Sequence, residues 1–494
     1  MNNLIKNKLF EDSKVHVPSR KGPPNRMNDL SYTDWMKFQK SFFKFTSAQK
    51  LIEECILFFT KSVWKDGNPS FSLVVGSDYL NTNALLPPRV VHEYSNLNTI
   101  HEIVSTLQQV ASLGKRYDFV LVDLRQYIKN SRTLSSFLSN YSDKVFRELK
   151  GILAPDKYCA ILVNTESTNG AGFPLPWAVA DSSRSWLKLR DEKVGIIEDD
   201  SKVLYCLFMQ NQSDERLPSS VRPSNIRIAK LHKKIPAWVI PKPPPRKKNE
   251  ILHPAKFPET LIKEFIEFFT KPGDSVFDPM VGTGSTVIAA IRSNRHGYGI
   301  DLIPEYVEIA KKRALDEVTP RMFPEFQNSA TFNIVQGDAT RLDELTDFPD
   351  VRFDYVVTSP PYWSILSNRG SEGQRARRIR DLPLTYSKDP RDLGNVEDYD
   401  HFLDLIEYTY NLVAEKLADS GYLTVIVKNV KRRHTIYTLA WDIAVRLCRK
   451  DGKYEYLGTT LWCQDDINIK PFAVGIHWVS NVLHQYCMHF RKRC

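Results

Sequence analysis

Cysteine is scarce in this chain, and long apolar runs are absent. The 494 residues include seven scattered cysteines with no CxxC pair and no histidine cluster at zinc-ligand spacing, so we expect neither a disulfide framework nor a metal site. No apolar run reaches the roughly 18 residues that a membrane span needs. The N-terminal residues, MNNLIKNKLFEDSKVHVPSR, interleave charged and apolar side chains and lack the apolar core of a secretory signal. We therefore expect a cytoplasmic protein with reduced thiols.

Basic residues outnumber acidic ones, which gives the chain a net charge of +10. Such a charge favours a polyanionic partner, because each neutralised phosphate releases counterions. The hydrophobic fraction of 42% is typical of a globular protein. Since one hydrophobic core rarely grows past about 250 to 300 residues, the length predicts two domains.

A Pro-rich basic stretch, IPAWVIPKPPPRKK (235–248), has neither a helical nor a strand period. It is typical of an extended polyproline spacer, although a surface loop inside one domain is the alternative. We expect an N-terminal α/β domain over 1–234, a linker over 235–249 and a catalytic domain over 250–494.

Strand and helix signals alternate through the C-terminal half. We expect strands at 275–280, 297–301, 332–338 and 353–359, and helices at 285–294 and 304–318. This alternation predicts a mostly parallel sheet with helices on both faces. Ligands of such sheets bind beyond the carboxyl ends of the strands. A Gly-rich turn, Asp301, Asp338 and the tetrapeptide SPPY all fall there.

The two halves share short likenesses. YDFVLVDLRQY (117–127) parallels FDYVVTSPPYW (353–363), and VLYCLFMQN (203–211) parallels VLHQYCMHFRK (482–492). These likenesses suggest that the N-terminal half is a diverged copy of the same sheet. Its chemistry would be lost, because Asp123, Leu124, Arg125 and Gln126 stand where the other half has Ser359, Pro360, Pro361 and Tyr362. We expect that half to contact DNA or to act as a scaffold.

The stretch FDPMVGTGST (277–286) joins an expected strand to an expected helix, where glycines allow the backbone to approach a ligand. It is not a phosphate-binding loop, because no Lys follows Gly284 and Asp278 would repel phosphate. Asp301 ends the next strand, where a carboxylate can accept from both ribose hydroxyls. Asp338 ends a third strand and could accept from an adenine amino group. The alternative for each aspartate is a helix N-cap.

Over residues 250–492, these motifs together resemble the amino-methylating DNA methyltransferases that use S-adenosylmethionine. HPAKFPETLI (253–262), FDPMVGTGST and TSPPYW (358–363) carry the likeness, and the TSPPY version is most similar to the cytosine-N4 branch. The cofactor loop precedes TSPPYW, which resembles a circularly permuted arrangement with no recognition domain between them. The resemblance implies a Rossmann-like methyltransferase fold, a double-stranded DNA substrate, and a partner restriction nuclease or defence-system subunits. It also implies these cofactor-binding residues: Lys256, Phe257, Phe277, Asp278, Gly282, Thr283, Gly284, Asp301 and Asp338.

The turn SPPY suits a base that has been flipped out of the helix. The Ser359 hydroxyl and the Pro360 carbonyl can accept from its amino group, and Pro361 stiffens the turn. Tyr362 can stack on the ring, at roughly 1 to 3 kcal/mol, with Trp363 behind it. Direct attack by the amino group needs no covalent intermediate. A cytosine-C5 methyltransferase would instead need a cysteine nucleophile after a proline near this position, and none of the seven cysteines lies there. The alternative is a proline turn that only packs aromatic side chains.

A polar stretch, SNRGSEGQRARRIRD (367–381), follows the turn and is expected to lie on the DNA backbone, with a solvated loop as the alternative. Its arginines are Arg369, Arg375, Arg377, Arg378 and Arg380. KNVKRRHTIY (428–437) and the N-terminal half are the candidate readers of DNA sequence.

Three rival functions stay open. An adenine-N6 enzyme shares the pocket chemistry, and a catalytically silent nucleic-acid-binding subunit would keep the pocket without turnover. An RNA substrate is the third, because a flipped base looks alike on either sugar.

Overall fold

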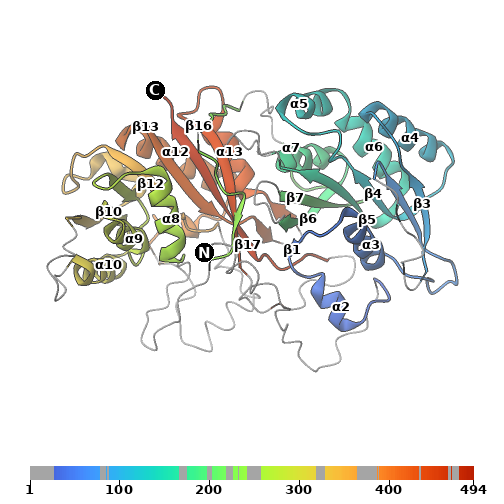
Figure 1. Ribbon diagram of the computed structural model, residues 1–494, viewed down its shortest axis with the longest axis horizontal. Helices are drawn as coiled ribbons and strands as arrows, with labels where there is room; N and C mark the ends of the chain where they lie inside the picture. Colours follow the sequence, from blue (N-terminus) through green and yellow to red (C-terminus); the bar gives the residue numbers. More distant parts are fainter. Residues whose placement is uncertain are drawn as a thin grey trace.

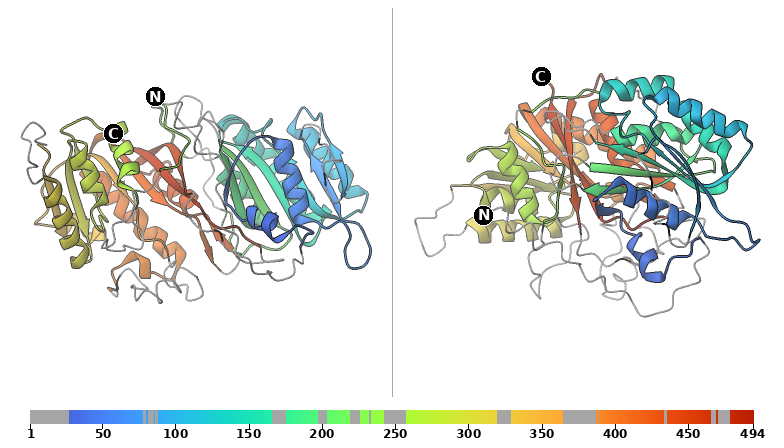
Figure 2. Two further views of the ribbon diagram at one scale, coloured as in Figure 1. Left: turned by 60° about the horizontal axis from the view of Figure 1, so that its bottom comes forward. Right: turned by 45° about the vertical axis from the view of Figure 1, so that its right-hand side comes forward.

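The computed structural model describes residues 27–77, 80, 85, 88–165, 175–196, 203–218, 226–231, 233–241, 257–318, 329–363, 387, 389–432, 435–464, 469 and 478–494. Within these ranges, no helix is long and apolar enough to cross a membrane. The chain forms two α/β halves that lie side by side (Figure 1) and stay so in both views of Figure 2.

The first half is a seven-stranded sheet with the order β1-β6-β7-β5-β4-β2-β3. Helix α3 covers one face, and α4 to α7 cover the other. The strands are β1 (Phe42–Lys44), β2 (Phe71–Val75), β3 (Val90–Tyr94), β4 (Tyr117–Asp123), β5 (Leu153–Asn164), β6 (Lys188–Ile196) and β7 (Val203–Gln210). The helices are α2 (Tyr32–Lys37), α3 (Ala48–Phe59), α4 (Ile100–Ser112), α5 (Ser131–Asn140), α6 (Ser142–Ile152) and α7 (Leu175–Ser182).

The second half is an eight-stranded sheet with the order β11-β10-β9-β12-β13-β17-β16-β8. Its strands are β8 (Trp238–Val239), β9 (Ser275–Asp278), β10 (His296–Asp301), β11 (Phe332–Gln336), β12 (Phe353–Thr358), β13 (Leu417–Val427), β16 (Tyr454–Cys463) and β17 (His484–Lys492). The helices are α8 (Glu259–Phe269), α9 (Ser285–Arg292), α10 (Pro304–Val318), α12 (Tyr399–Lys416) and α13 (Leu439–Cys448), and β14 (Val430–Arg432) pairs with β15 (Thr435–Tyr437). The pairs from β11 to β13 are parallel and only β17 runs antiparallel to its neighbours, so the predicted Rossmann-like α/β fold is confirmed.

The seven strands of the first sheet match seven of the eight strands of the second. In each sheet a run of parallel strands ends in an antiparallel hairpin, and a short strand pairs in parallel with the outer strand of that hairpin. Even the register breaks coincide. They fall between Tyr117 and Phe119 in β4·β5 and between Phe353 and Tyr355 in β12·β13. The first half lacks a counterpart of β11 among its described strands.

Side-chain contacts outside the strands repeat as well. In the first half, Arg89 Nε donates to Thr60 Oγ1 at 2.9 Å, and Asp118 accepts from the backbone N–H of Phe71 at 3.0 Å. The second half repeats both bonds: Arg295 Nε to Thr270 Oγ1 at 3.0 Å, and Ser275 N–H to Asp354 at 2.8 Å. These bonds fix the start of the first central strand, so the scaffolds agree in detail away from the carboxyl edges.

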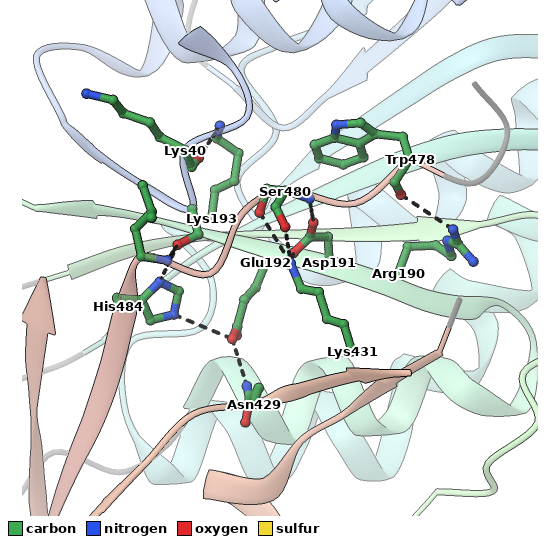
Figure 3. Close-up of polar contacts among 12 residues, drawn as sticks. Lys40, Arg190, Asp191, Glu192, Lys193, Asn429, Lys431, Trp478, Ser480 and His484 are labelled. Carbon is green, nitrogen blue, oxygen red and sulfur yellow. Dashed lines mark hydrogen bonds and ion pairs between the residues drawn. The ribbon is translucent and has the colours of Figure 1, made fainter. Parts of the chain in front are cut away.

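A buried polar contact joins the halves, mainly between β6 and the segments around β14 and β17 (Figure 3). Lys431 Nζ lies 2.5 Å from an Asp191 carboxylate oxygen, with exposed side-chain fractions of 9% and 0%. Glu192 accepts from Asn429 at 2.7 Å and from the Tyr486 hydroxyl. Burial acts to raise the pKa of Glu192, but the hydrogen bonds from His484, Tyr486 and Asn429 outweigh it and lower that pKa.

The boundary between the halves lies earlier than the sequence indicates. Ile228 bridges Tyr456, and β8 pairs with β16, so residues on both sides of position 234 pack on the second sheet. Trp238–Val239 is therefore a short edge strand and not part of a free polyproline spacer, whereas residues 242–250 lie outside the described ranges. Conversely, Trp478 from the second half is buried in the core under α3 of the first. The halves thus share core residues.

Candidate functional site

A cavity opens at the carboxyl edge of the second sheet. It encloses about 850 Å³ of empty space including its open mouth. Six segments line it: the chain before α8, the Gly-rich loop, the ends of β10 and β11, the turn after β12, and the chain before α12. Of the predicted site residues, those that line it are Phe257, Gly282, Thr283, Asp301, Asp338, Ser359, Pro360 and Pro361.

Asp278 supports the Gly-rich loop from below. Its buried carboxylate accepts from the backbone N–H of Met280 at 3.0 Å and from the hydroxyl of Thr286 at 2.6 Å. Burial raises the pKa of Asp278 to about 6. Asp278 therefore shapes the loop between β9 and α9. It does not line the cavity, although its prediction as a cofactor residue would require it to.

Gly284 has a packing role that the sequence did not show. It begins α9 with φ = 88°, and a Cβ there would lie 3.0 Å from the Cβ of Ala310 in α10. Gly282, with φ = 52°, lets its N–H donate to Asp301 at 2.7 Å. One glycine therefore brings two helices together, and the other turns the loop onto the next strand.

Another predicted cofactor residue does not line the cavity. Phe277 is fully buried in the core, where its ring stacks on Phe353 at a centroid distance of 4.6 Å. The expectation for Phe277 was therefore wrong in position: β9 is buried on both faces, and this side chain points into the core beneath the loop. Lys256 lies outside the described residues.

Three carboxylates face the cavity: Asp301, Asp338 and Asp392. Asp301 accepts from the backbone N–H groups of Gly282 and Ile303, and burial raises its pKa to about 6. Asp338 caps the following turn through Thr340, at 2.9 Å to its N–H, so the N-cap alternative holds together with a place in the cavity. Each oxygen of an ionised carboxylate can accept more than one bond. The set fits a ligand with hydroxyl or amino donors and a positive centre, as S-adenosylmethionine has.

Lowering the pH should weaken ligand binding because it protonates Asp301. A carboxyl with a pKa of about 6 is ionised at pH 7.5 but largely protonated at pH 5, so affinity for S-adenosylhomocysteine should fall roughly tenfold between those values. Asp301→Asn should bind more weakly at pH 7.5 and lose most of this dependence, which calorimetry at several pH values will measure. The same raised pKa makes folding stability highest below about pH 4 and lower as pH rises through 6. Through this group, a rise in pH therefore strengthens ligand binding but lowers the free energy of unfolding. An affinity independent of pH would contradict the assignment.

The turn after β12 places Ser359 beside a chain of polar side chains. The Ser359 hydroxyl lies 3.5 Å from the Tyr362 hydroxyl, which donates to Gln485 Oε1 at 2.6 Å. Gln485 in turn donates to Gln464 at 3.2 Å. Burial raises the pKa of Tyr362 to about 12, so it stays a donor at neutral pH. The sequence predicted Ser359 and Tyr362, but Gln485 comes from β17, far along the chain, and no local pattern indicated it.

Trp363 packs beneath the turn. It is 2% exposed, its indole N–H donates to the Glu397 carbonyl at 3.2 Å, and its ring contacts Tyr399 and Tyr437 at centroid distances of 4.8 and 4.6 Å. It does not line the cavity, so any effect on the base would act through the turn.

Several other expectations fall outside the structure or were incomplete. Arg369, Arg375, Arg377, Arg378 and Arg380 lie in the range 364–386, which is not described. Among the described residues, no group of three or more His, Cys, Asp or Glu could hold a metal ion. Four residues that the sequence did not single out also line the cavity: Met280, Tyr306, Arg391 and Asp392.

Short stretches of known methyltransferases resemble this chain. M2.DpnII, a type II methyltransferase of Streptococcus pneumoniae, is 46% identical over 61 residues, which are 12% of this chain and 23% of that protein. M.HpaI of Haemophilus parainfluenzae is 42% identical over 66 residues, 13% and 21% respectively. M.BglII, recorded from Bacillus subtilis, is 39% identical over 62 residues, 13% and 17% respectively. The chain thus matches about a fifth of the length of these relatives.

Solved structures resemble the chain at low identity. TrmN from Thermus thermophilus is 11% identical with a TM-score of 0.30, over 80% of this chain and 79% of that one. Magnesium protoporphyrin IX methyltransferase from Synechocystis, with SAH bound, is 12% identical with a TM-score of 0.28, over 47% and 80%.

The sequence model of a family described as DNA methylase, N6_N4_Mtase, matches residues 19–312. This span is more than half of the chain. It runs from the first half through the Gly-rich loop and Asp301, and it ends before TSPPYW. The chain belongs to this DNA methylase family.

Proposed function

We propose that this protein transfers a methyl group from S-adenosylmethionine to the exocyclic amino group of a flipped base in double-stranded DNA, most specifically to N4 of cytosine. One observation carries the proposal. Ser359, Pro360 and Pro361 line the same cavity as Asp301 and Asp338, so acceptors for an amino group and acceptors for a cofactor share one space.

The hydrogen bonds around the turn suit Ser359 to accept from an amino group. The Tyr362 hydroxyl donates its hydrogen bond to Gln485 Oε1, so its oxygen can accept from the Ser359 hydroxyl. The lone pairs of Ser359 Oγ then remain for the substrate, next to the Pro360 carbonyl. The bound cofactor supplies an electrophilic methyl group. The rigid turn holds the amino lone pair toward the cavity, and such positioning contributes much of the rate.

The choice of cytosine N4 rests on Ser359, since the TSPPY version is most similar to the cytosine-N4 branch. An adenine-N6 enzyme shares the acceptors and is the second candidate. A silent binding subunit is disfavoured because Asp301, Asp338 and Ser359 all line the cavity. Similarity to type II methyltransferases supports a cytoplasmic role in restriction-modification or defence, with a cognate nuclease as partner.

Nucleoside mass spectrometry tests the proposal. Unmethylated mixed-sequence DNA is incubated with the protein and S-adenosylmethionine, and a reaction without cofactor is the control. N4-methylcytosine is the expected product, whereas N6-methyladenine would keep the mechanism and change the base. Product made only from RNA in a competition of the two polymers would change the substrate. No methylated nucleoside from either polymer would overturn the proposal.

The first half, as we infer, is a diverged copy that acts as a scaffold or DNA contact. At the position of Ser359 it has Asp123, which is 1% exposed and paired with Arg125 at 2.6 Å. This ion pair occupies the strand end where the second half presents its acceptors. Arg125→Gln should therefore leave the turnover of the folded protein within about threefold of wild type, because the pair is remote from the cavity. Loss of methyl transfer without weaker DNA binding, measured by rates and gel shift, would contradict this role.

A further inference from the structure

Lys428 lies directly beside the turn that holds Ser359. It is the first residue after β13, and β13 lies between β12 and β17. Thr358, the last residue of β12, pairs with Val425, and Val427 pairs with Tyr486. Continued by one residue, this register puts Lys428 opposite Gln485. Lys428 is thus at the carboxyl edge, between the SPPY turn and the glutamine that binds Tyr362.

The side chains of Lys428 and Gln485 continue one face of the sheet. Ile426 and Cys487, two residues before and after them on the paired strands, lie in the core cluster under α8. Because side chains alternate along a strand, Lys428 and Gln485 extend that face past its apolar part. The face therefore ends in polar groups, at the level where a flipped base would enter.

Lys428 has no hydrogen bond or ion pair within the part of the chain that the structure describes. It is half-buried, and burial lowers its pKa to about 8. Other buried lysines have partners: Lys431 binds Asp191, and Lys193 donates to the carbonyls of Phe38 and Lys40 at 2.5 and 2.6 Å. An ammonium that is partly withdrawn from water and has no protein acceptor is disfavoured. An acceptor supplied by a ligand would explain why a lysine stands here.

The first half serves as an internal comparison. Its residues at the matching positions are Asn164 and Leu204, which pair across β5 and β7. Neighbouring positions are conserved between the copies, with Cys206 matching Cys487. The differences at Lys428 and Gln485 therefore coincide with the exchange of Asp123 for Ser359, and the three positions form one cluster around the turn.

Resting on the proposed methyl transfer, we propose that the Lys428 ammonium donates a hydrogen bond to the ring nitrogen beside the target amino group. That atom is N3 of cytosine, or N1 of adenine if adenine is the substrate. Both are acceptors on the same edge as the amino group. Ser359 and Pro360 offer only acceptors to this edge, and a lysine offers only donors. Together they would bind the amino group and its neighbouring acceptor while rejecting a base such as thymine, which has a carbonyl and an N–H in those places.

Lys428→Met tests this contact on two DNA duplexes. One carries the natural base at a mapped target site, and the other carries its deaza analogue, 3-deazacytosine or 1-deazaadenine, in which a C–H replaces the ring nitrogen. On natural DNA, kcat/KM should fall about 10- to 100-fold, the range for a charge-assisted bond. On the deaza duplex, variant and wild type should agree within about threefold, because the acceptor is gone. An equal fall on both duplexes would indicate a phosphate contact and overturn the proposal, as would no fall on natural DNA.

Two controls separate this proposal from its premises. The variant should bind S-adenosylhomocysteine like wild type and melt at the same or a higher temperature, because methionine removes an unpaired charge. Lys450→Met, at an exposed lysine near the opposite edge of the sheet, should leave kcat/KM unchanged. If wild type itself methylates neither base, the proposed function fails. If wild type is active and the variant equals it on natural DNA, only the assignment of Lys428 fails.

Discussion

A Ser359→Ala variant is expected to bind S-adenosylhomocysteine as wild type does and to lose about 10²- to 10³-fold in kcat. The hydroxyl lines the cavity at the turn, whereas the carboxylates of Asp301 and Asp338 lie on other strands and are unchanged. Losing one preorganised partner of a reacting group costs that much in enzymes where it has been removed. Single-turnover rates on unmethylated DNA, with cofactor affinity measured in parallel, separate the two effects.

The design includes a matched serine. Ser112→Ala removes an exposed hydroxyl at the end of α4, bonded only locally to the Gln109 carbonyl, and should change neither rate nor affinity. If Ser359→Ala weakened cofactor binding in proportion to its rate, Ser359 would belong to the cofactor site. An unchanged rate would remove it from the mechanism, and the Pro360 carbonyl alone would then have to hold the amino group.

Local sequence signals predicted the second sheet well because each of its first strands and helices is formed by one short stretch of the chain. The helix expected at 304–318 is Pro304–Val318, and the strands that carry Asp301 and Ser359 lie where alternation placed them. The prediction that Phe277 contacts the cofactor was wrong for a physical reason. All four residues of β9 are buried, so the strand shows no alternation to say which side chains face a ligand and which face the core.

Contacts between distant segments could not be predicted in this way. Gln485 enters the site from β17, far along the chain from the turn, and strand order and register bring it there. Asp392 enters from the chain before α12. Likewise, short likenesses indicated a second copy of the sheet, but nothing local indicated that Trp478 would fill the core of that copy. Such contacts depend on how the two halves pack. The sequence of each half predicts a complete α/β unit and therefore does not indicate this packing.

Breaking the buried pair between the halves is expected to cost about 3 to 5 kcal/mol of unfolding free energy. Within the described ranges, Lys431→Met leaves the buried Asp191 with only two donors, the backbone N–H groups of Glu192 and Ser480. Urea titration followed by circular dichroism will measure the loss as a lower midpoint. Adding Asp191→Leu should restore only part of it, because the Ser480 N–H then loses its acceptor.

An exposed ion pair provides the comparison for this prediction. The methyl-transfer activity of the folded variant then tests whether the contact between the halves supports the site. Lys416→Met removes a pair with Asp350 whose side chains are 27% and 97% exposed, and should cost less than about 1 kcal/mol. Similar losses in both variants would mean that the contact between the halves contributes little. Asp191 and Glu192 hold Lys431, Asn429 and His484, which are close in sequence to Lys428 and Gln485, whereas the cofactor cavity lies on other strands. Folded Lys431→Met protein should therefore lose methyl transfer while keeping its affinity for S-adenosylhomocysteine, which would show that the first half supports the base side of the site.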